Sequence, residues 1–214
     1  MPIKARDIHA DSIATSSALS ELYVPNVITP LQVIRILNAV KVRFMLLGAH
    51  GIGGWTREPR ATKDVDVLVA TRGHKKAVQA LHSAFPRLQV EDHDVVTRFR
   101  DLETMTVLID LMKPNQPLYL DALKHTHRVT SGGQSYYVPA VEMALAMKFS
   151  AMISLTRSED KKLFDAGDFI RIVKANTAID LEKLHTLGQL IDNGGGDELV
   201  EKVQQVRAGE NLIL

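Results

Sequence analysis

The stretch that decides the fold runs from Phe44 to Val69 and reads FMLLGAHGIGGWTREPRATKDVDVLV. Its apolar start leads into Gly48, and the run Lys63–Val69 alternates carboxylate with valine. This pattern predicts two strands joined by a glycine-rich turn, a short helix and a basic loop. On the second strand Asp64 and Asp66 would share one face, about 6.5–7 Å apart, while the valines face a core. Such carboxylates repel each other unless a cation neutralises them, and they suit Mg²⁺ bound together with a phosphate substrate.

The rest of the chain predicts further strands and helices. Thr29 and Pro30 are typical of a helix start, and Asp110 lies inside the apolar strand Met105–Met112. We also expect a loose arm over residues 1–28 with a short helix at Ser16–Leu22. The other expected elements are a helix at 74–85, strands at 88–90 and 94–100, a hairpin at 127–130 and 136–138, and helices near 140–156, 159–175, 180–191 and 197–207, the last after a flexible glycine-rich break at 193–196.

Two motifs in this order resemble a known signature. Gly48-Ala49-His50, followed by Pro59-Arg60-Ala61-Thr62-Lys63-Asp64-Val65-Asp66, is similar to the nucleotidyltransferase-fold superfamily that includes DNA polymerase β and kanamycin nucleotidyltransferase. Within it, the bacterial branch related to abortive-infection toxins is the most similar, over roughly residues 31–175. Taken alone, the glycine turn is common and DVDV could be an edge strand with a solvated face. The ordered combination, with Asp110 as a third carboxylate, favours the resemblance.

The resemblance implies a fold and a domain organisation. The fold would be mixed α/β, also describable as α+β, with a mixed sheet flanked by helices. A nucleotidyltransferase-fold domain would span residues 29–139, after the arm at 1–28. A helical region over 140–214 would close the cleft.

The resemblance also implies roles for individual residues. Two Mg²⁺ ions would be bridged by Asp64 and Asp66, while Asp110 would hold only the ion at the attacking hydroxyl and act as general base. The expected nucleotide-binding residues are Gly48 and Ala49 through their N–H groups, His50 as a phosphate or substrate donor, Arg60 and Lys148 as counter-charges, and Thr62 on the face of the two aspartates.

Lys148 interrupts the apolar stripe of the first C-terminal helix. Its side chain either extends outward to water or points into a polar site, and the resemblance favours a place near the nucleotide phosphates. On the next helix Asp165 and Asp168 lie three residues apart, and their spacing resembles the corresponding helix of the abortive-infection branch. We expect them on a solvated face with local ion pairs.

Composition excludes several classes of protein. The 214 residues suit one domain or two small ones, and the net charge of +1 does not indicate a class of binding partner. The absence of cysteine excludes disulfides and thiolate metal sites, and the histidines show no metal-site spacing. No apolar stretch approaches the roughly 18 residues of a membrane span, and no secretory signal is recognisable, so we expect a cytoplasmic protein. Local basic groups that could contact tRNA are Arg98 with Arg100, and the cluster Lys124, His125, His127 and Arg128.

Two functions follow. The first is a metal-dependent nucleotidyltransferase that moves a nucleoside monophosphate, or nucleotides, from a nucleoside triphosphate to a hydroxyl of tRNA, a small molecule or a protein, for example as the toxin of a toxin–antitoxin pair. The second is a non-catalytic member that binds a nucleotide or a partner such as a cognate antitoxin. Three acidic residues in place favour the first, since unpaired carboxylates without a metal lower stability.

Overall fold

The computed structural model describes residues 28–58 and 60–212, which fall into two compact units, Met1–Val138 and Pro139–Leu214. The expected arm, including its helix at Ser16–Leu22, lies outside the described residues except for Ile28, which is buried. None of the helices among the described residues is both long and apolar enough to cross a membrane.

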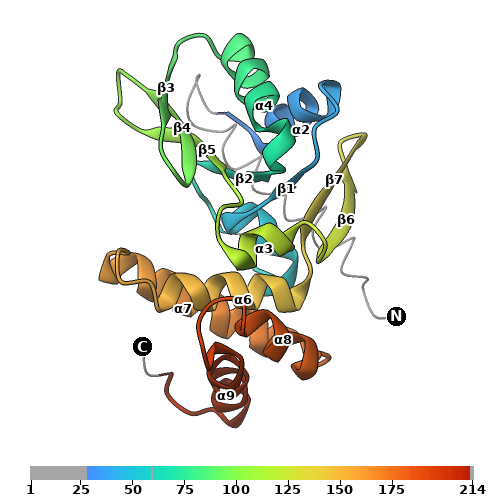
Figure 1. Cartoon of the computed structure of the whole chain (residues 1–214), viewed down its shortest axis with the longest axis vertical. Coiled ribbons are helices and arrows are strands. Elements are labelled where there is room, and N and C mark those ends of the chain that lie inside the picture. Colours follow the sequence, from blue (N-terminus) through green and yellow to red (C-terminus); the bar gives the residue numbers. More distant parts are fainter. Residues whose placement is uncertain (1–27, 59, 213–214) are drawn as a thin grey trace. The chain divides into compact units, whose positions relative to one another are not determined.

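The first unit is built on a mixed five-stranded sheet (Figure 1). Its strands are β1 (Phe44–Leu46), β2 (Val65–Val69), β3 (Leu88–Asp92), β4 (Val96–Asp101) and β5 (Val107–Met112). The spatial order is β1-β2-β5-β4-β3, with β2 and β5 parallel and every other pair of neighbours antiparallel. β5, the last of these five strands in the chain, therefore lies between two strands made earlier, and the predicted mixed sheet is confirmed.

Helices cover this sheet on both sides of β1 and β2 (Figure 1). The helices are α2 (Pro30–Ala39), α3 (Gly48–Thr56), α4 (Thr71–Ala84) and the short α5 (Pro117–Ala122), and β6 (Thr126–Ser131) and β7 (Gln134–Pro139) form a hairpin. Thr29 caps α2 as predicted: its hydroxyl accepts from the Gln32 N–H, and the Gln32 side chain accepts from the Thr29 N–H. This capping box fixes where α2 begins.

The period-two alternation of the strands separates an apolar face from one that carries Asp66 and Asp110 among apolar residues such as Leu68. Val65, Val67 and Val69 of β2, together with Ile109 and Leu111 of β5, are buried in one core. The same core receives Val33, Ile34 and Leu37 from α2, and Ala77 and Leu81 from α4. Burying such side chains contributes about 1.5–3 kcal/mol for each large aliphatic group. The intervening residues of β2 and β5 must then face the other side of the sheet.

Some predicted boundaries are wrong. The second strand begins at Val65 and not at Lys63, so Asp64 lies in a bend before β2. The Thr62 hydroxyl donates to the Asp64 carboxylate, and a local side-chain bond of this kind competes with strand pairing. The predicted strand at 105–112 begins only at Val107, and α5 was not predicted at all. Both differences fall beside turns, where periodicity is too short to read.

The second unit is helical, as predicted. Its helices are α6 (Val141–Met152), α7 (Glu159–Ala175), α8 (Leu181–Gly188) and α9 (Gly195–Ala208). Of the predicted flexible break at 193–196, residues 193–194 form an exposed turn, while Gly195 and Gly196 are the packed start of α9. Gly195 and Gly196 are buried there, and a Cβ on Gly196 would lie 2.6 Å from the His185 carbonyl oxygen. That residues 140–214 close a cleft stays a prediction.

Candidate active site

Two carboxylates stand opposite each other at the centre of the sheet. Asp66 on β2 and Asp110 on β5 are direct partners in the parallel ladder, and both are half-buried. Neighbouring strands are about 4.8 Å apart, so the two side chains leave the polar face of the sheet side by side. Asp64 follows from the bend before β2, with its carboxylate bonded to Thr62. The same-face argument from strand geometry therefore holds for Asp66 and Asp110 but not for Asp64.

The start of α3 packs closely against this pair of strands, at Asp66. The Leu47 N–H donates to the Asp66 carbonyl oxygen at 2.8 Å, which fixes the end of β1 beside β2. Gly48 then adopts φ +55°, and a Cβ built on it would lie 2.0 Å from Asp66 Oδ2. Only glycine combines that left-handed backbone with so close an approach. The Gly51 N–H closes the first turn, so the preceding N–H groups point out of the helix end, where the partial charge is positive.

We expect Gly48→Ala to lower the free energy of unfolding by more than the roughly 1–2 kcal/mol of a left-handed alanine, because the added Cβ also displaces the Asp66 carboxylate. Gly133→Ala is the matched control: Gly133 has φ +71° and a Cβ there meets nothing within 4 Å. Urea denaturation of both variants and the parent measures the difference. Equal losses for the two variants would show that the contact with Asp66 has no energetic weight.

His50 is the buried polar residue of this helix start. Burial lowers the pKa of His50 to about 4, against the opposing charge of Asp64 and a hydrogen bond to its backbone, and the Arg60 charge lowers it further. The imidazole is therefore neutral at pH 7. Its Nδ1 is buried with no hydrogen-bond partner among the residues that the structure describes. The predicted role of His50 as a phosphate or substrate donor stays a prediction. In that role the imidazole would donate its hydrogen bond in the neutral form.

The other predicted nucleotide ligands are placed differently. Arg60 is exposed on the loop before β2, near enough to His50 to act on its charge. Lys148 lies in the second unit and is buried, so the alternative that it extends to water is wrong. Its Nζ donates to Asp165 Oδ1 at 2.8 Å and to Asp168 Oδ2 at 2.7 Å. A role near nucleotide phosphates stays a prediction.

The expectation of a solvated face for these two aspartates is wrong. Asp165 and Asp168 are buried, and each has an arginine in addition to Lys148. Arg157 Nε lies 2.6 Å from Asp165 Oδ2, and Arg171 Nη1 donates to Asp168 Oδ1 at 3.1 Å. Two negative charges in the interior are thus compensated by three positive ones, which is how buried charges are tolerated.

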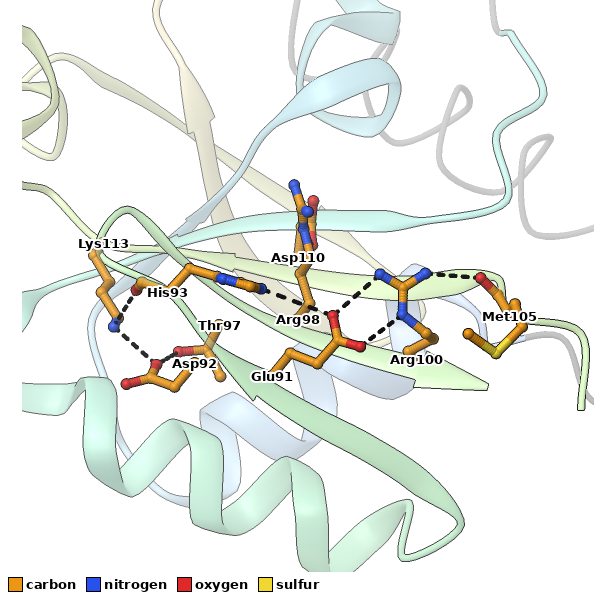
Figure 2. Close-up of polar contacts among 9 residues, drawn as sticks. All are labelled: Glu91, Asp92, His93, Thr97, Arg98, Arg100, Met105, Asp110 and Lys113. Atoms are coloured by element: carbon orange, nitrogen blue, oxygen red, sulfur yellow. Dashed lines mark hydrogen bonds and ion pairs between the residues drawn. The ribbon is translucent and has the colours of Figure 1, made fainter. Parts of the chain in front are cut away.

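Sequence reasoning missed the partner of Asp110. Arg98 on β4 is its antiparallel partner, and Arg98 Nε donates to Asp110 Oδ1 at 3.2 Å (Figure 2). Asp110 interrupts an apolar strand, which was a signal that it needs a partner, but the sequence does not give the register of β4 against β5. Arg100, the other arginine predicted for tRNA contact, is bonded to Glu91 and to the Met105 carbonyl.

The donor set fits a hard divalent cation shared with a phosphate ligand. Asp66 and Asp110 offer carboxylate oxygens from opposed positions on two rigid strands, beside the close approach of Gly48. Across residues 28–58 and 60–212, no group of three His, Asp or Glu side chains already converges as a metal site. Mg²⁺ is commonly held by only one or two carboxylates, with substrate phosphates completing the shell. The site therefore fits a metal that arrives with its substrate better than a preformed metal cage.

Comparison with known proteins supports the fold. No protein-family model and no curated protein sequence matches the chain. The antibiotic-resistance factor ANT(2'')-Ia is similar in structure, with a TM-score of 0.51, 13% identity and coverage of 73% of this chain and 85% of that chain. The lincosamide antibiotic adenylyltransferase LnuA, solved with lincomycin bound, has a TM-score of 0.50 and 14% identity over 71% of this chain and 100% of that chain.

A third structure, an antigenic nucleotidyltransferase-like protein from Paracoccidioides brasiliensis, has a TM-score of 0.49 and 16% identity over 90% of this chain and 93% of that chain. At these identities the first two likenesses establish fold and not activity. The chain has the nucleotidyltransferase fold that its sequence predicted.

Proposed function

We propose that the chain is a metal-dependent nucleotidyltransferase that moves a nucleoside monophosphate from a nucleoside triphosphate to a hydroxyl acceptor. The observation that carries this proposal is the pairing of Asp66 with Asp110 across two parallel strands, directly beside the start of α3. Carboxylates so placed suit a metal–phosphate complex, and amides at a helix start suit the phosphates themselves.

Each group has a task in this reaction. The N–H groups of Gly48 and Ala49 bind the terminal phosphates, and Arg60 and Thr62 lie on the loop that leads to the site. Asp64 and Asp66 would hold two Mg²⁺ ions, and Asp110 would hold one of them. Mg²⁺ bound there would supply charge neutralisation and a lower pKa for the acceptor hydroxyl. Asp110 takes the hydroxyl proton, the acceptor oxygen bonds to the α-phosphorus, and pyrophosphate leaves.

The identity of the acceptor that receives the nucleotide is a further part of the proposal. Candidates are a small molecule, tRNA or a protein. Two similar structures are an antibiotic-resistance factor and a lincosamide antibiotic adenylyltransferase, which supports a small-molecule hydroxyl. The motif order around Asp64 and the Lys148 helix supports the branch related to abortive-infection toxins, and with it a toxin that meets a cognate antitoxin protein.

One observation favours a second function, a non-catalytic member that binds a nucleotide or a partner. Within the described part of the chain no three acidic or histidine side chains converge, and Arg98 takes one oxygen of Asp110. A protein that had given up catalysis would keep the fold and lose only this convergence. Nucleotide binding without transfer would identify that function.

The test of the proposed site is a charge change in Asp66. Mg²⁺ should raise the affinity for a nucleoside triphosphate, and Asp66→Asn should remove that increase because it keeps the side-chain shape but removes one unit of ligand charge. Calorimetry with and without Mg²⁺ measures both. Asp92→Asn, which removes an exposed carboxylate paired with Lys113 on the same sheet, is the control and should bind like the parent. Equal Mg²⁺-dependent binding by Asp66→Asn and the parent would rule out the site.

A further inference from the structure

We infer that Arg98 is a built-in counter-ion of Asp110 that holds the metal-free site together and opposes the binding of a metal without its nucleotide. This inference rests on the proposed function, because it assumes that Asp110 is a metal ligand. It assigns a task to Arg98, which no motif singles out as part of the site. The task follows from the register of three strands and from the partners of two arginines.

The register places three charges in one row. Asp66 on β2 is opposite Asp110 on β5, and Asp110 is opposite Arg98 on β4. Directly opposed residues of neighbouring strands point to the same side of a sheet. The row is therefore two negative charges followed by one positive charge, with Asp110 in the middle. The Asp110 side chain is 17% exposed and the Arg98 side chain 38%, so water screens this pair only in part.

The partners of the two arginines on β4 separate their roles. Arg100 uses Nε and Nη2 on the two oxygens of Glu91 and Nη1 on the Met105 carbonyl. Arg98 contacts Asp110 through Nε, the nitrogen nearest its chain (Figure 2). Arg100 is thus hydrogen-bonded to an acid on β3 and acts on Asp110 only through its charge, whereas Arg98 is hydrogen-bonded to Asp110 itself. The hydrogen-bond partner of Arg98 is therefore a proposed metal ligand, and that of Arg100 is not.

This arrangement has opposite effects on the metal-free and the metal-bound protein. Without a cation the carboxylates of Asp66 and Asp110 repel each other, and the Arg98 guanidinium relieves that repulsion. A divalent cation needs the same Asp110 oxygen and is itself repelled by the guanidinium. Nucleotide phosphates bring negative charge that offsets Arg98, so metal and nucleotide bind together more readily than the metal binds alone. Arg98 therefore favours binding of the metal together with the nucleotide over binding of the metal alone.

The experiment measures Mn²⁺ binding in the absence of nucleotide, with the full chain. Arg98→Gln should bind Mn²⁺ about tenfold or more tightly than the parent, because one unit charge within a few ångströms of a divalent ion is removed. When a chelator has removed all divalent metal, the same variant should unfold at a lower temperature than the parent. Arg98→Lys, which keeps the charge, should restore the parent affinity. Lys113→Gln removes the same charge from the same sheet, but Lys113 is paired with Asp92, and its Mn²⁺ affinity should equal that of the parent.

A double variant isolates the pair. When Asp110→Asn is already present, adding Arg98→Gln should bring a smaller gain in Mn²⁺ affinity than it brings in the parent, since part of its effect acts through the contact with Asp110. If Arg98→Gln does not fold, the parent itself provides the readout: the ¹⁵Nε resonance of Arg98 should shift on addition of Mg²⁺ with a nucleoside triphosphate and shift less with Mg²⁺ alone. Equal shifts would overturn the inference.

The outcomes separate this inference from the proposed function. If the parent binds Mg²⁺ with nucleotide but Arg98→Gln gains no more Mn²⁺ affinity than Lys113→Gln, the counter-ion role is overturned and the function stands. If Arg98→Gln gains affinity but the parent does not bind Mg²⁺ with nucleotide, the role of Arg98 is supported and the function fails. Failure of both measurements overturns both.

Discussion

Asp110→Ala is expected to leave the affinity for the nucleoside triphosphate close to that of the parent and to slow transfer by about 10²–10⁴-fold, the usual effect of losing a positioned base. The reason is its place in the sheet. Asp66 lies beside Gly48 and the start of α3, where the phosphates are expected, while Asp110 lies one strand further away, toward Arg98. Binding and turnover should therefore respond separately to its loss.

The assay supplies each labelled nucleoside triphosphate with Mg²⁺ to mixed tRNA, to aminoglycosides and lincosamides, and to the protein itself, and follows label transfer and pyrophosphate release. Asp92→Ala is the control for loss of a carboxylate on the same sheet and should transfer at the parent rate. Transfer by Asp110→Ala at the parent rate would remove that carboxylate from the chemistry. If the parent binds nucleotide but labels no pool, the non-catalytic function becomes the better one.

Lys148→Met is expected to lower the free energy of unfolding by about 3–5 kcal/mol, the range for removing one partner of a buried ion pair. The substitution keeps most of the side-chain volume but leaves Asp165 and Asp168 in the interior without the ammonium that lies between them. Arg157 and Arg171, which are partly exposed, contact only the other oxygen of each carboxylate. Urea denaturation followed by circular dichroism measures the loss.

Lys162→Met, on α7 with Asp165 and Asp168, is the control. Lys162 pairs with the exposed Glu159, so its replacement should change stability by at most about 1 kcal/mol. Adding Asp165→Asn and Asp168→Asn to Lys148→Met should recover part of the loss, because the uncompensated charges are then removed. Unchanged stability combined with weaker nucleotide binding would contradict this structural role and favour the phosphate contact implied by the family resemblance.

Sequence predicted the parts of the fold that local chemistry determines. The capping box at Thr29, the glycine at the start of α3 and the alternation of β2 each act within a few residues, so their physical causes can be read directly. The same holds for the resemblance, whose motifs lie between Gly48 and Asp66. The placement of Asp66 beside Asp110 followed only from that resemblance, because pairing between distant strands leaves no local pattern.

The errors have two origins. Alternation alone predicts Asp64 on the strand and does not show the local bond from Thr62 to its carboxylate. Charged residues usually lie on a solvated face, but the burial of Asp165 depends on Lys148 from another helix. The pairing of Arg98 with Asp110 depends on strand register. In the last two cases a partner distant in sequence decided the outcome.

The order of the sheet has a consequence for synthesis on the ribosome. Before β5 emerges, the chain can form only two separate antiparallel pairs, β1 with β2 and β3 with β4. β5 joins them by inserting between β2 and β4, in a non-local step of the kind that slows folding. Because Asp110 is carried by β5, a nascent chain lacks the Asp66–Asp110 pair until β5 is in place. Metal and nucleotide binding would thus begin only when the sheet is complete.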